Sequence, residues 1–424
     1  MAEEKEKSLQ ERIEEAKKAK DIAVEKKVLP EKEDFTLPHN SNIDLSSLLA
    51  GDSHHNHHHH HHSSHSSSHH HSSGHHHRHH KHRMSKKKKR MIIVVSVILG
   101  LLLAFLITAG IIIHSYISKM NIVKEEAEIY ETIDIDDLVD EPDSPKEKIA
   151  SLEEQIKANF NKEGLMESKD VMNILLLGTD ARTNNERGRS DSMILVSINK
   201  QTKQIVMTSF LRDTYLTIPG IETTRLNHAY AYGGADLVVK TIEQNFKIKI
   251  DKYAQIDFTS FVNVIDAVGG VDLEITAEEA QYMPKYIDQI GGSGADYVSA
   301  GKQHLNGKQA LAYSRIRYVG TDFGRTERQR KVLEQVFIKA KKLDIGELDD
   351  LMDKLLPNVT TNLTEWDLYK LILKSPSYFK FDLKQCRVPI DDSYEYMTIR
   401  SMSVIGIDFE VNKKYLYKNI FNAN

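Results

Sequence analysis

The chain has 424 residues, a formal net charge of −4 and a single cysteine, Cys386. One cysteine excludes an internal disulfide framework, so a folded region of this chain must be held by its hydrophobic core alone. The net charge averages a strongly basic segment with acidic stretches, and it therefore indicates no class of partner.

Residues 1–85 are predicted to be disordered. The stretch up to Lys27 is rich in glutamate and lysine, and tracts of serine and histidine follow. This composition offers too little apolar surface to offset the entropy lost on ordering. Most of the chain's 22 histidines lie between His54 and His82. A solvated tail explains that tract better than a selected site for Zn²⁺ or Ni²⁺, although imidazole nitrogens bind both metals.

A single transmembrane helix is predicted over Met91–Ile113, directly after the basic run at 86–90. The segment carries no charge, and as a helix it would reach roughly 34 Å, enough to cross a hydrocarbon core. Basic residues beside a span stay in the cytoplasm, so the N-terminus is expected inside and residues 114–424 outside. A cleaved signal peptide is disfavoured, because the polar lead is long and no small-residue cleavage site follows.

The chain beyond the membrane is expected to form three parts: an extracellular stalk over 114–170, a main folded domain over 171–343 and a C-terminal extension over 344–424. The stalk contains an amphipathic helix around Lys146–Ala158. In the extension, a helix-rich stretch around Trp366 gives way to strand-like alternation over 396–411.

Strands and helices alternate in the expected domain. Strand-like segments at 174–177, 193–198 and 205–210 are followed by helical patterns at 235–246 and 325–341. Such alternation predicts an α/β/α sandwich, in which helices cover a mixed central β-sheet.

Arginine and aspartate recur where the predicted strands end. In the strand-like YSRIRY at 313–318, period-two alternation would place Arg315 and Arg317 on one inward face. In the next helix, Arg325 and Gln329 continue an inward apolar stripe. Inward guanidinium groups need anions, and phosphate oxygens satisfy them in pairs. Two carboxylates such as Asp180 and Asp191 are suited to hold a hard divalent cation beside the same phosphates.

Each of these pairs, taken alone, is more often a surface ion pair. Together they favour a phosphate-binding site, because so many arginines cannot all be rim charges when several fall on predicted inward faces. The sequence contains no Walker loop, no G-x-S-x-G motif and no Cys/His pair, so nucleotide hydrolysis and acyl transfer have no support.

Successive blocks between residues 173 and 333 resemble, in order, those of the LytR-CpsA-Psr family. They are NILLLGTDAR (173–182), GRSDSMILVSI (188–198), SFLRDTYLTIPG (209–220), RLNHAYAYGG (225–234), VIDAVGGVDLEI (264–275), LNGKQALAYSRIRY (305–318) and DFGRTERQRKVL (322–333). The resemblance implies a phosphotransferase that moves a glycopolymer, such as teichoic acid or capsular polysaccharide, from an undecaprenyl-pyrophosphate carrier to peptidoglycan. It also implies Mg²⁺, or Mn²⁺, as the cofactor.

Carried over by motif, Asp180 and Asp191 are the expected metal ligands. The residues expected to hold the pyrophosphate are Arg189, Arg212, Arg225, Arg315, Arg317, Arg325 and Gln329. Catalytic roles are expected for Arg212, Asp213, Arg315 and Arg317. Asp213 is a candidate base for the acceptor hydroxyl, and an ion pair with its neighbour Arg212 is an equal alternative. The role of His228 stays open, and an apolar cleft between sheet and helices is expected to shelter the prenyl chain.

Two other functions stay open from the sequence. A membrane-bound transcriptional attenuator is opposed by the topology, since the basic run is explained by anionic membrane lipid and retention in the cytoplasm. No nucleic-acid partner is therefore expected. A non-catalytic surface protein that binds pyrophosphate lipids would need the same residues as the transferase.

Overall fold

The computed structural model describes residues 141–179, 188–344, 346–347 and 355–422, together with scattered positions in 107–122 and residues 139, 351 and 353. The predicted tail over 1–85 and nearly all of the predicted membrane span lie outside the described residues, as do Asp180 and Arg182. Within the described ranges, no helix is long and apolar enough to cross a membrane.

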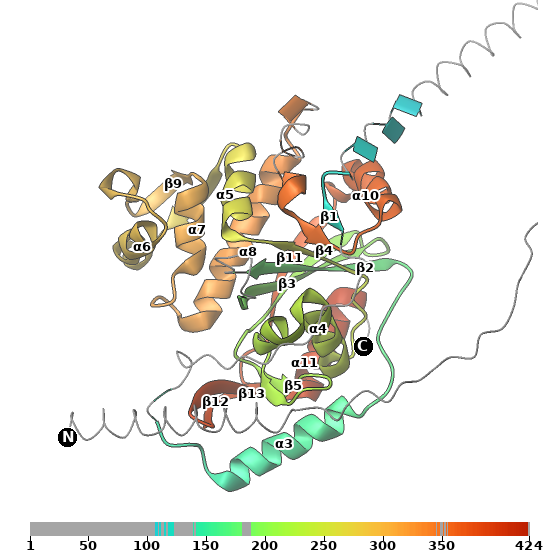
Figure 1. The fold of residues 1–424 in the computed structure, drawn as a ribbon, viewed down its shortest axis with the longest axis vertical. Coiled ribbons are helices and arrows are strands. Elements are labelled where there is room, and N and C mark those ends of the chain that lie inside the picture. The colour runs from blue at the N-terminus through green and yellow to red at the C-terminus, as the bar shows by residue number, and fades with distance from the viewer. Residues whose placement is uncertain are drawn as a thin grey trace, which may run out of the picture. The chain divides into compact units, whose positions relative to one another are not determined.

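Across the described residues, a mixed sheet of seven strands forms the centre of the fold, in the order β1-β10-β7-β2-β3-β4-β11 (Figure 1). The three predicted strands are confirmed as β2 (Val171–Thr179), β3 (Ser190–Asn199) and β4 (Gln204–Phe210), which pair antiparallel in succession. These strands bury side chains on both faces, as expected of a sheet covered by helices on both sides.

The outer strands complete the sheet. β7 (Lys252–Ile256) runs parallel to β2, and β11 (Asp382–Val388) runs parallel to β4. The short strands β10 (Thr360–Thr361) and β1 (Asn121–Ile122) extend the edge formed by β7. Consequently β2, β4, β7 and β11 all end at one edge of the sheet, and β3 begins there.

One face of the sheet carries the larger hydrophobic core. It is covered by α4 (His228–Phe246), α11 (Phe409–Phe421) and α3 (Lys146–Phe160). Two hairpins pack into the same core. One pairs β5 (Tyr215–Thr217) with β6 (Thr223–Arg225), and the other pairs β12 (Tyr394–Ile399) with β13 (Met402–Ile407).

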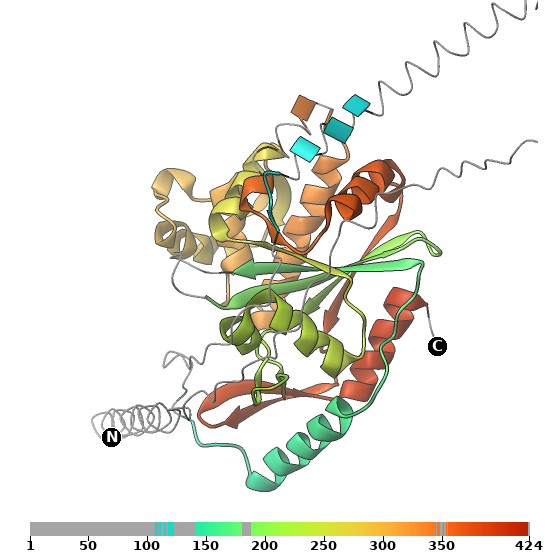
Figure 2. The same ribbon diagram turned by 45° about the vertical axis from the view of Figure 1, so that its right-hand side comes forward.

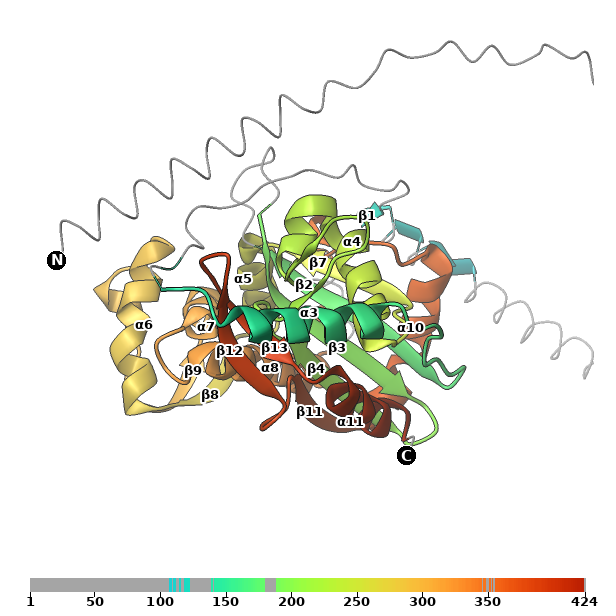
Figure 3. The same cartoon turned by 90° about the horizontal axis from the view of Figure 1, so that it is seen from below.

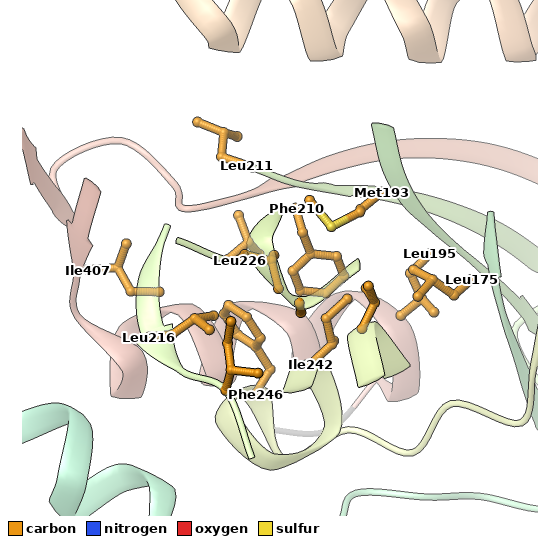
Figure 4. Packing of buried hydrophobic residues seen from close by; sticks show 14 of the residues in the cluster. Leu175, Met193, Leu195, Phe210, Leu211, Leu216, Leu226, Ile242, Phe246 and Ile407 are labelled. Carbon is orange, nitrogen blue, oxygen red and sulfur yellow. The ribbon is translucent and has the colours of Figure 1, made fainter. Parts of the chain in front are cut away.

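Aromatic and branched side chains fill this core. In Figure 4, Leu175 and Leu195 of the sheet face Ile242 of α4. The rings of Phe210 and Phe246 pack with their centroids 4.9 Å apart. Apolar burial of this kind, at about 1.5–3 kcal/mol per large side chain, has to stabilise a domain that has no disulfide.

The other face carries α5 (Phe258–Ala267), α7 (Gly307–Arg315), α8 (Thr321–Ala340) and α10 (Glu365–Tyr378), seen above the sheet in Figure 2. A second core lies beyond the sheet, between α7, α6 (Ala277–Gln289) and the hairpin of β8 (Val271–Ile275) with β9 (Gly301–Leu305). The 3₁₀ turns Gly294–Asp296 and Leu356–Asn358 connect elements of this layer. Helices therefore lie on both faces of a mixed sheet.

The predicted strand at 313–318 is wrong, because this segment ends a helix. The side chain of Asn306 accepts a hydrogen bond from the Gln309 backbone N–H, and the Gln309 side chain bonds back to the Asn306 backbone. This capping box starts α7, which runs to Arg315 and ends before Ile316. Arg317 follows in the loop after this helix and not on a strand face.

The packed core reaches beyond the domain expected over 171–343. In the expected stalk, α3 inserts Leu152 and Ile156 into the main core, and Figure 3 shows this helix lying along the body of the fold. Gly406 of β13 permits the approach, since a Cβ there would lie 2.9 Å from Leu152 Cδ2. In the expected extension, β11 joins the central sheet. The alternation over 396–411 resolves into a hairpin and the start of α11, which Asp408 caps.

Candidate active site

The polar residues singled out in the sequence gather where β2, β4 and β7 end and β3 begins. Asp191 is the second residue of β3, and Arg212 follows the end of β4. Ends of parallel strands that meet at one edge of an α/β sheet are a usual place for a ligand site. Arg315 and Arg317 reach the same place from the end of α7, and Arg325 from the first turns of α8.

Asp191 is the centre of an arginine network. Its Oδ1 lies 2.6 Å from Arg212 Nη1, and its Oδ2 lies 3.2 Å from Arg317 Nη2. Arg325 Nη2 donates to the backbone carbonyl of Asp191 at 3.3 Å. Burial by itself would raise the pKa of Asp191, but Arg325, Arg212 and Arg317 outweigh it and lower the pKa to about 2. The carboxylate is therefore ionised at neutral pH.

Asp322 is a second acid in this network, and the sequence did not assign it a role. Its Oδ1 lies 2.6 Å from Arg325 Nη2 and 3.8 Å from Arg212 Nε. Burial raises the pKa of Asp322 in spite of the attraction of Arg325. Its i,i+3 spacing to Arg325 on α8 is the one sequence signal for this contact, and that spacing is equally typical of a surface pair.

Asp213 lies between two arginines and does not line the cavity described below. Its Oδ2 is 3.5 Å from Arg212 Nε, and its Oδ1 is 3.5 Å from Arg225 Nη1. Arg225 in turn places Nη2 3.0 Å from His228 Nε2, and Thr224 Oγ1 lies 3.0 Å from His228 Nδ1. Arg225, grouped in the sequence with the phosphate ligands, thus belongs to a buried layer behind the site.

A cavity of about 670 Å³ opens beside this network, between the sheet and the helices α5, α7 and α8. The polar residues expected to bind pyrophosphate that line it are Arg189, Arg212, Arg315, Arg317, Arg325 and Gln329. The apolar lining includes Leu177, Ile194, Ile256, Phe258, Phe261, Val264, Leu311, Val332, Leu333, Val336, Leu355 and Val359. The cavity thus combines a cationic part with an apolar one, and an apolar cleft between sheet and helices is confirmed.

The cavity residues differ in how firmly they are held. Arg315 Nη2 lies 3.5 Å from Gln289 Oε1, and its guanidinium stands over the Phe258 ring at 5.0 Å. Arg317 is held by Asp191, so the two arginines have different partners although both line the cavity. Among the described residues, the buried Oε1 of Gln329 has no hydrogen-bond partner. A buried oxygen of this kind is suited to accept a bond from a ligand or water.

Of the two expected metal ligands, the structure describes only Asp191, because Asp180 lies outside the described residues. Among the described residues, no group of three His, Cys, Asp or Glu side chains is suited to hold a metal ion. Asp191 offers the ionised oxygen donor that a hard cation prefers. Both its oxygens contact guanidinium groups, so a cation there would have to replace at least one of these contacts.

Comparison with known proteins decides the family. The model of the LytR_cpsA_psr family matches residues 138–415. The chain belongs to the LytR-CpsA-Psr family. The match includes α3 and the first half of α11, so it extends on both sides of the domain expected over 171–343, as the packed core does.

Two teichoic acid transferases and one solved structure are similar to this chain over much of their length. The polyisoprenyl-teichoic acid–peptidoglycan teichoic acid transferase TagU of Enterococcus faecalis is 33% identical over 258 residues, which are 59% of this chain and 81% of TagU. The corresponding transferase TagT of Bacillus subtilis is 33% identical over 257 residues, 59% of this chain and 72% of TagT. A solved structure of TagT bound to LIIa-WTA is similar with a TM-score of 0.51 and 28% identity, covering 62% of this chain and 95% of that one.

Proposed function

We propose that this protein is a membrane-anchored phosphotransferase that moves a glycopolymer from a polyprenyl-pyrophosphate carrier to peptidoglycan. The observation that carries the proposal is the cavity, in which a cluster of arginines adjoins an apolar lining. A carrier of this class has an anionic head and an apolar chain, and it matches both parts. The transferase names of TagU and TagT, each 33% identical, support the same reaction class.

Binding and chemistry follow from the two parts of the site. The apolar lining would receive the prenyl chain, and Arg189, Arg212, Arg315, Arg317 and Arg325 would hold the two phosphates. In the reaction, a hydroxyl oxygen of the peptidoglycan sugar forms a bond to the phosphorus attached to the glycopolymer. The bond from that phosphorus to the bridging oxygen breaks, and polyprenyl phosphate leaves. Guanidinium groups stabilise the charge that develops on the leaving phosphate.

For the metal, we propose Mg²⁺, or Mn²⁺, held by Asp180 and Asp191. When bound, such an ion would supply further charge neutralisation at the phosphates. The ionised state of Asp191 supports a hard cation, and the surrounding arginines keep the carboxylate ionised without it.

Asp213 is better suited to position Arg212 than to act as the base. It lies outside the cavity lining and between Arg212 and Arg225, so its oxygens already serve two cations. The acceptor proton would then leave to a phosphate oxygen or to solvent. This assignment favours the ion-pair alternative for Asp213.

The anchoring part of the proposal rests on the uncharged segment Met91–Ile113 and on the basic residues before it. This topology would put the cavity on the extracellular side of the membrane, and it therefore opposes a role as a transcriptional attenuator. A non-catalytic protein that binds pyrophosphate lipids would use the same cavity, and the transferase names of TagU and TagT favour catalysis over binding alone.

The test is transfer by the full chain in detergent, supplied with a polyprenyl-pyrophosphate glycan, peptidoglycan fragments and Mg²⁺. Mass spectrometry should detect a phosphodiester-linked product, and the variant Arg212→Ala should not form it. If the parent protein binds the carrier tightly but, like the variant, forms no product, it is a binding protein and the transferase assignment is rejected.

A further inference from the structure

The outward face of α10 exposes large apolar side chains. Trp366, the chain's only tryptophan, is 61% exposed, and Leu373 is 65% exposed. Within the described residues 141–422, these are the two most exposed large apolar side chains. They are seven residues apart, which places them on the same side of a helix. An apolar pair held outward on a regular element is typical of a contact surface.

The other side of α10 is fixed to the sheet, so the outward residues are not needed for the core. Leu371 and Tyr378 pack with Ile198 and Ile205 in a third hydrophobic cluster. The start of the helix is held by a capping box between Thr364 and Asp367. Substitutions at Trp366 and Leu373 should therefore leave the fold intact.

Lysines accompany the exposed apolar pair. Lys370 and Lys374 are exposed on the same helix, and Lys370 Nζ stands 5.4 Å from the centre of the Trp366 ring. Both also line a hollow of about 830 Å³ between α10 and the sheet edge where β2 begins. The other lysines lining it are Lys169, Lys200, Lys249 and Lys252, against the acids Glu167, Asp251 and Asp367. Lys252 Nζ lies 2.8 Å and Lys370 Nζ 3.6 Å from Asp367, so part of this charge is neutralised. The lysines lining the hollow still outnumber the acids, which makes its lining net positive and complementary to an anionic partner.

The chain enters the folded part beside this helix. β1 pairs with β10, with Asn121 opposite Thr360, and α10 begins at Glu365, four residues after β10 ends. In the view of Figure 1, β1 and α10 lie in the same part of the fold, joined through β10. The predicted membrane span ends at Ile113, and eight residues reach at most about 29 Å when extended. The actual reach is shorter, because Ser118 N donates to His114 O at 3.0 Å in a helical turn.

We infer that the outward face of α10 lies on the membrane, with Trp366 and Leu373 in the interfacial layer and Lys370 and Lys374 on anionic phospholipid headgroups. Tryptophan concentrates at the membrane interface, and clustered lysines are attracted to anionic lipid. This inference rests on the membrane anchoring in the proposed function.

A second attachment point beside the anchor would fix the orientation of the domain. Leu355 and Val359 line the cavity, and Val359 directly precedes β10. Contact of α10 with the bilayer would therefore bring the apolar lining at these residues toward the layer in which the carrier's prenyl chain is dissolved.

The single tryptophan provides the test. The full chain is reconstituted into phosphatidylcholine vesicles with or without phosphatidylglycerol, and Trp366 emission is recorded with brominated phosphatidylcholine as quencher. In anionic vesicles the emission should shift to shorter wavelength and be quenched. The double variant Lys370→Glu/Lys374→Glu should reduce the quenching at least about twofold. The matched control Lys302→Glu/Lys308→Glu makes the same charge change on β9 and α7, away from α10. This control should be quenched as strongly as the parent protein.

The outcomes separate the inference from the proposed anchoring. A chain that floats with the vesicles after a high-salt wash, but whose Trp366 is unquenched, would overturn the α10 contact and leave the anchoring intact. A chain that fails to float would reject both. Emission that shifts only when peptidoglycan fragments are added would assign the face to wall polymer instead of membrane. Transfer activity in detergent should be unchanged in both double variants, which shows that they fold.

Discussion

Arg325 touches Asp191 at two points: its Nη2 donates to the Asp191 backbone carbonyl at 3.3 Å, and its Nη1 lies 3.9 Å from the Asp191 carboxylate. The Arg325 side chain is 2% exposed, and Asp322 is its closest carboxylate. One buried guanidinium thus joins the first turns of α8 to the beginning of β3. The same guanidinium therefore lines the cavity and holds two elements of the fold together.

Arg325→Ala should therefore destabilise the fold as well as the site. The substitution removes the nearest cation of Asp322, at 2.6 Å, and leaves only the more distant Arg212 at 3.8 Å. Breaking a buried ion pair costs about 3–5 kcal/mol of unfolding free energy. Chemical denaturation of the variant and of the exposed control Lys308→Ala should show this difference. A loss below about 1 kcal/mol, as for a surface pair, would mean that the network does not stabilise the structure.

The sequence predicted those features that depend on local periodicity. The apolar runs of β2, β3 and β4 and the inward stripe of α8 were recognised in this way. The strand prediction for YSRIRY fails, because a short segment with apolar residues such as Tyr313 and Ile316 fits both a strand and the end of a helix. The deciding signal, the capping box at Asn306, lies seven residues earlier.

Other features depend on contacts that sequence spacing cannot show. The docking of α3 relies on Leu152 meeting Gly406, far away in the chain. A role for Asp322 does not follow from the sequence, because its pair with Arg325 has the spacing of an ordinary surface pair and its burial comes from packing against other elements. The different partners of Arg315 and Arg317 follow from the turn after α7.

Arg315→Lys and Arg317→Lys should each lower transfer by about 10²-fold, or about 2.7 kcal/mol, as is typical for loss of one preorganised charge-stabilising donor. Lysine retains the charge but cannot reproduce the planar fork that addresses two oxygens. Melting temperatures should change little, since the Arg317 side chain is 48% exposed. The control Arg400→Lys alters an exposed arginine paired with Glu222 and should keep full activity. Near-parental rates in both site variants would mean that these arginines contribute only their positive charge and not the geometry of the guanidinium group.

Asp213→Asn distinguishes a positioning role from that of a base. Asparagine keeps the shape and one acceptor for Arg212, so transfer should fall by less than about tenfold, whereas removal of a general base costs about 10²–10⁴-fold. Rates are measured across the pH range. A loss above 10²-fold, accompanied by disappearance of the acid limb of the pH profile, would restore Asp213 as the base.

Chelation should abolish transfer, and Mg²⁺ or Mn²⁺ should restore it. Asp191→Ala should lose the metal response, because one of the two proposed ligands is removed. Metal binding is measured directly by calorimetry with Mg²⁺ alone, and circular dichroism checks that the variant is folded. Transfer by the parent protein that continues unchanged in excess chelator would remove the metal from the mechanism.

Asp191 should also make stability depend on pH. Its pKa is lowered from 3.8 to about 2 in the folded protein, so the unfolded chain takes up this proton first as the pH falls. The carboxylate contributes stability above about pH 4, and this contribution is lost progressively as the pH falls toward 2. The size is about 2 kcal/mol. Denaturation of the parent and of Asp191→Asn between pH 7 and pH 2 should therefore give a difference that shrinks below pH 4. The exposed control Glu274→Gln corrects for the general effect of acid, and a difference that stayed constant down to pH 2 would contradict the buried arginine network as its cause.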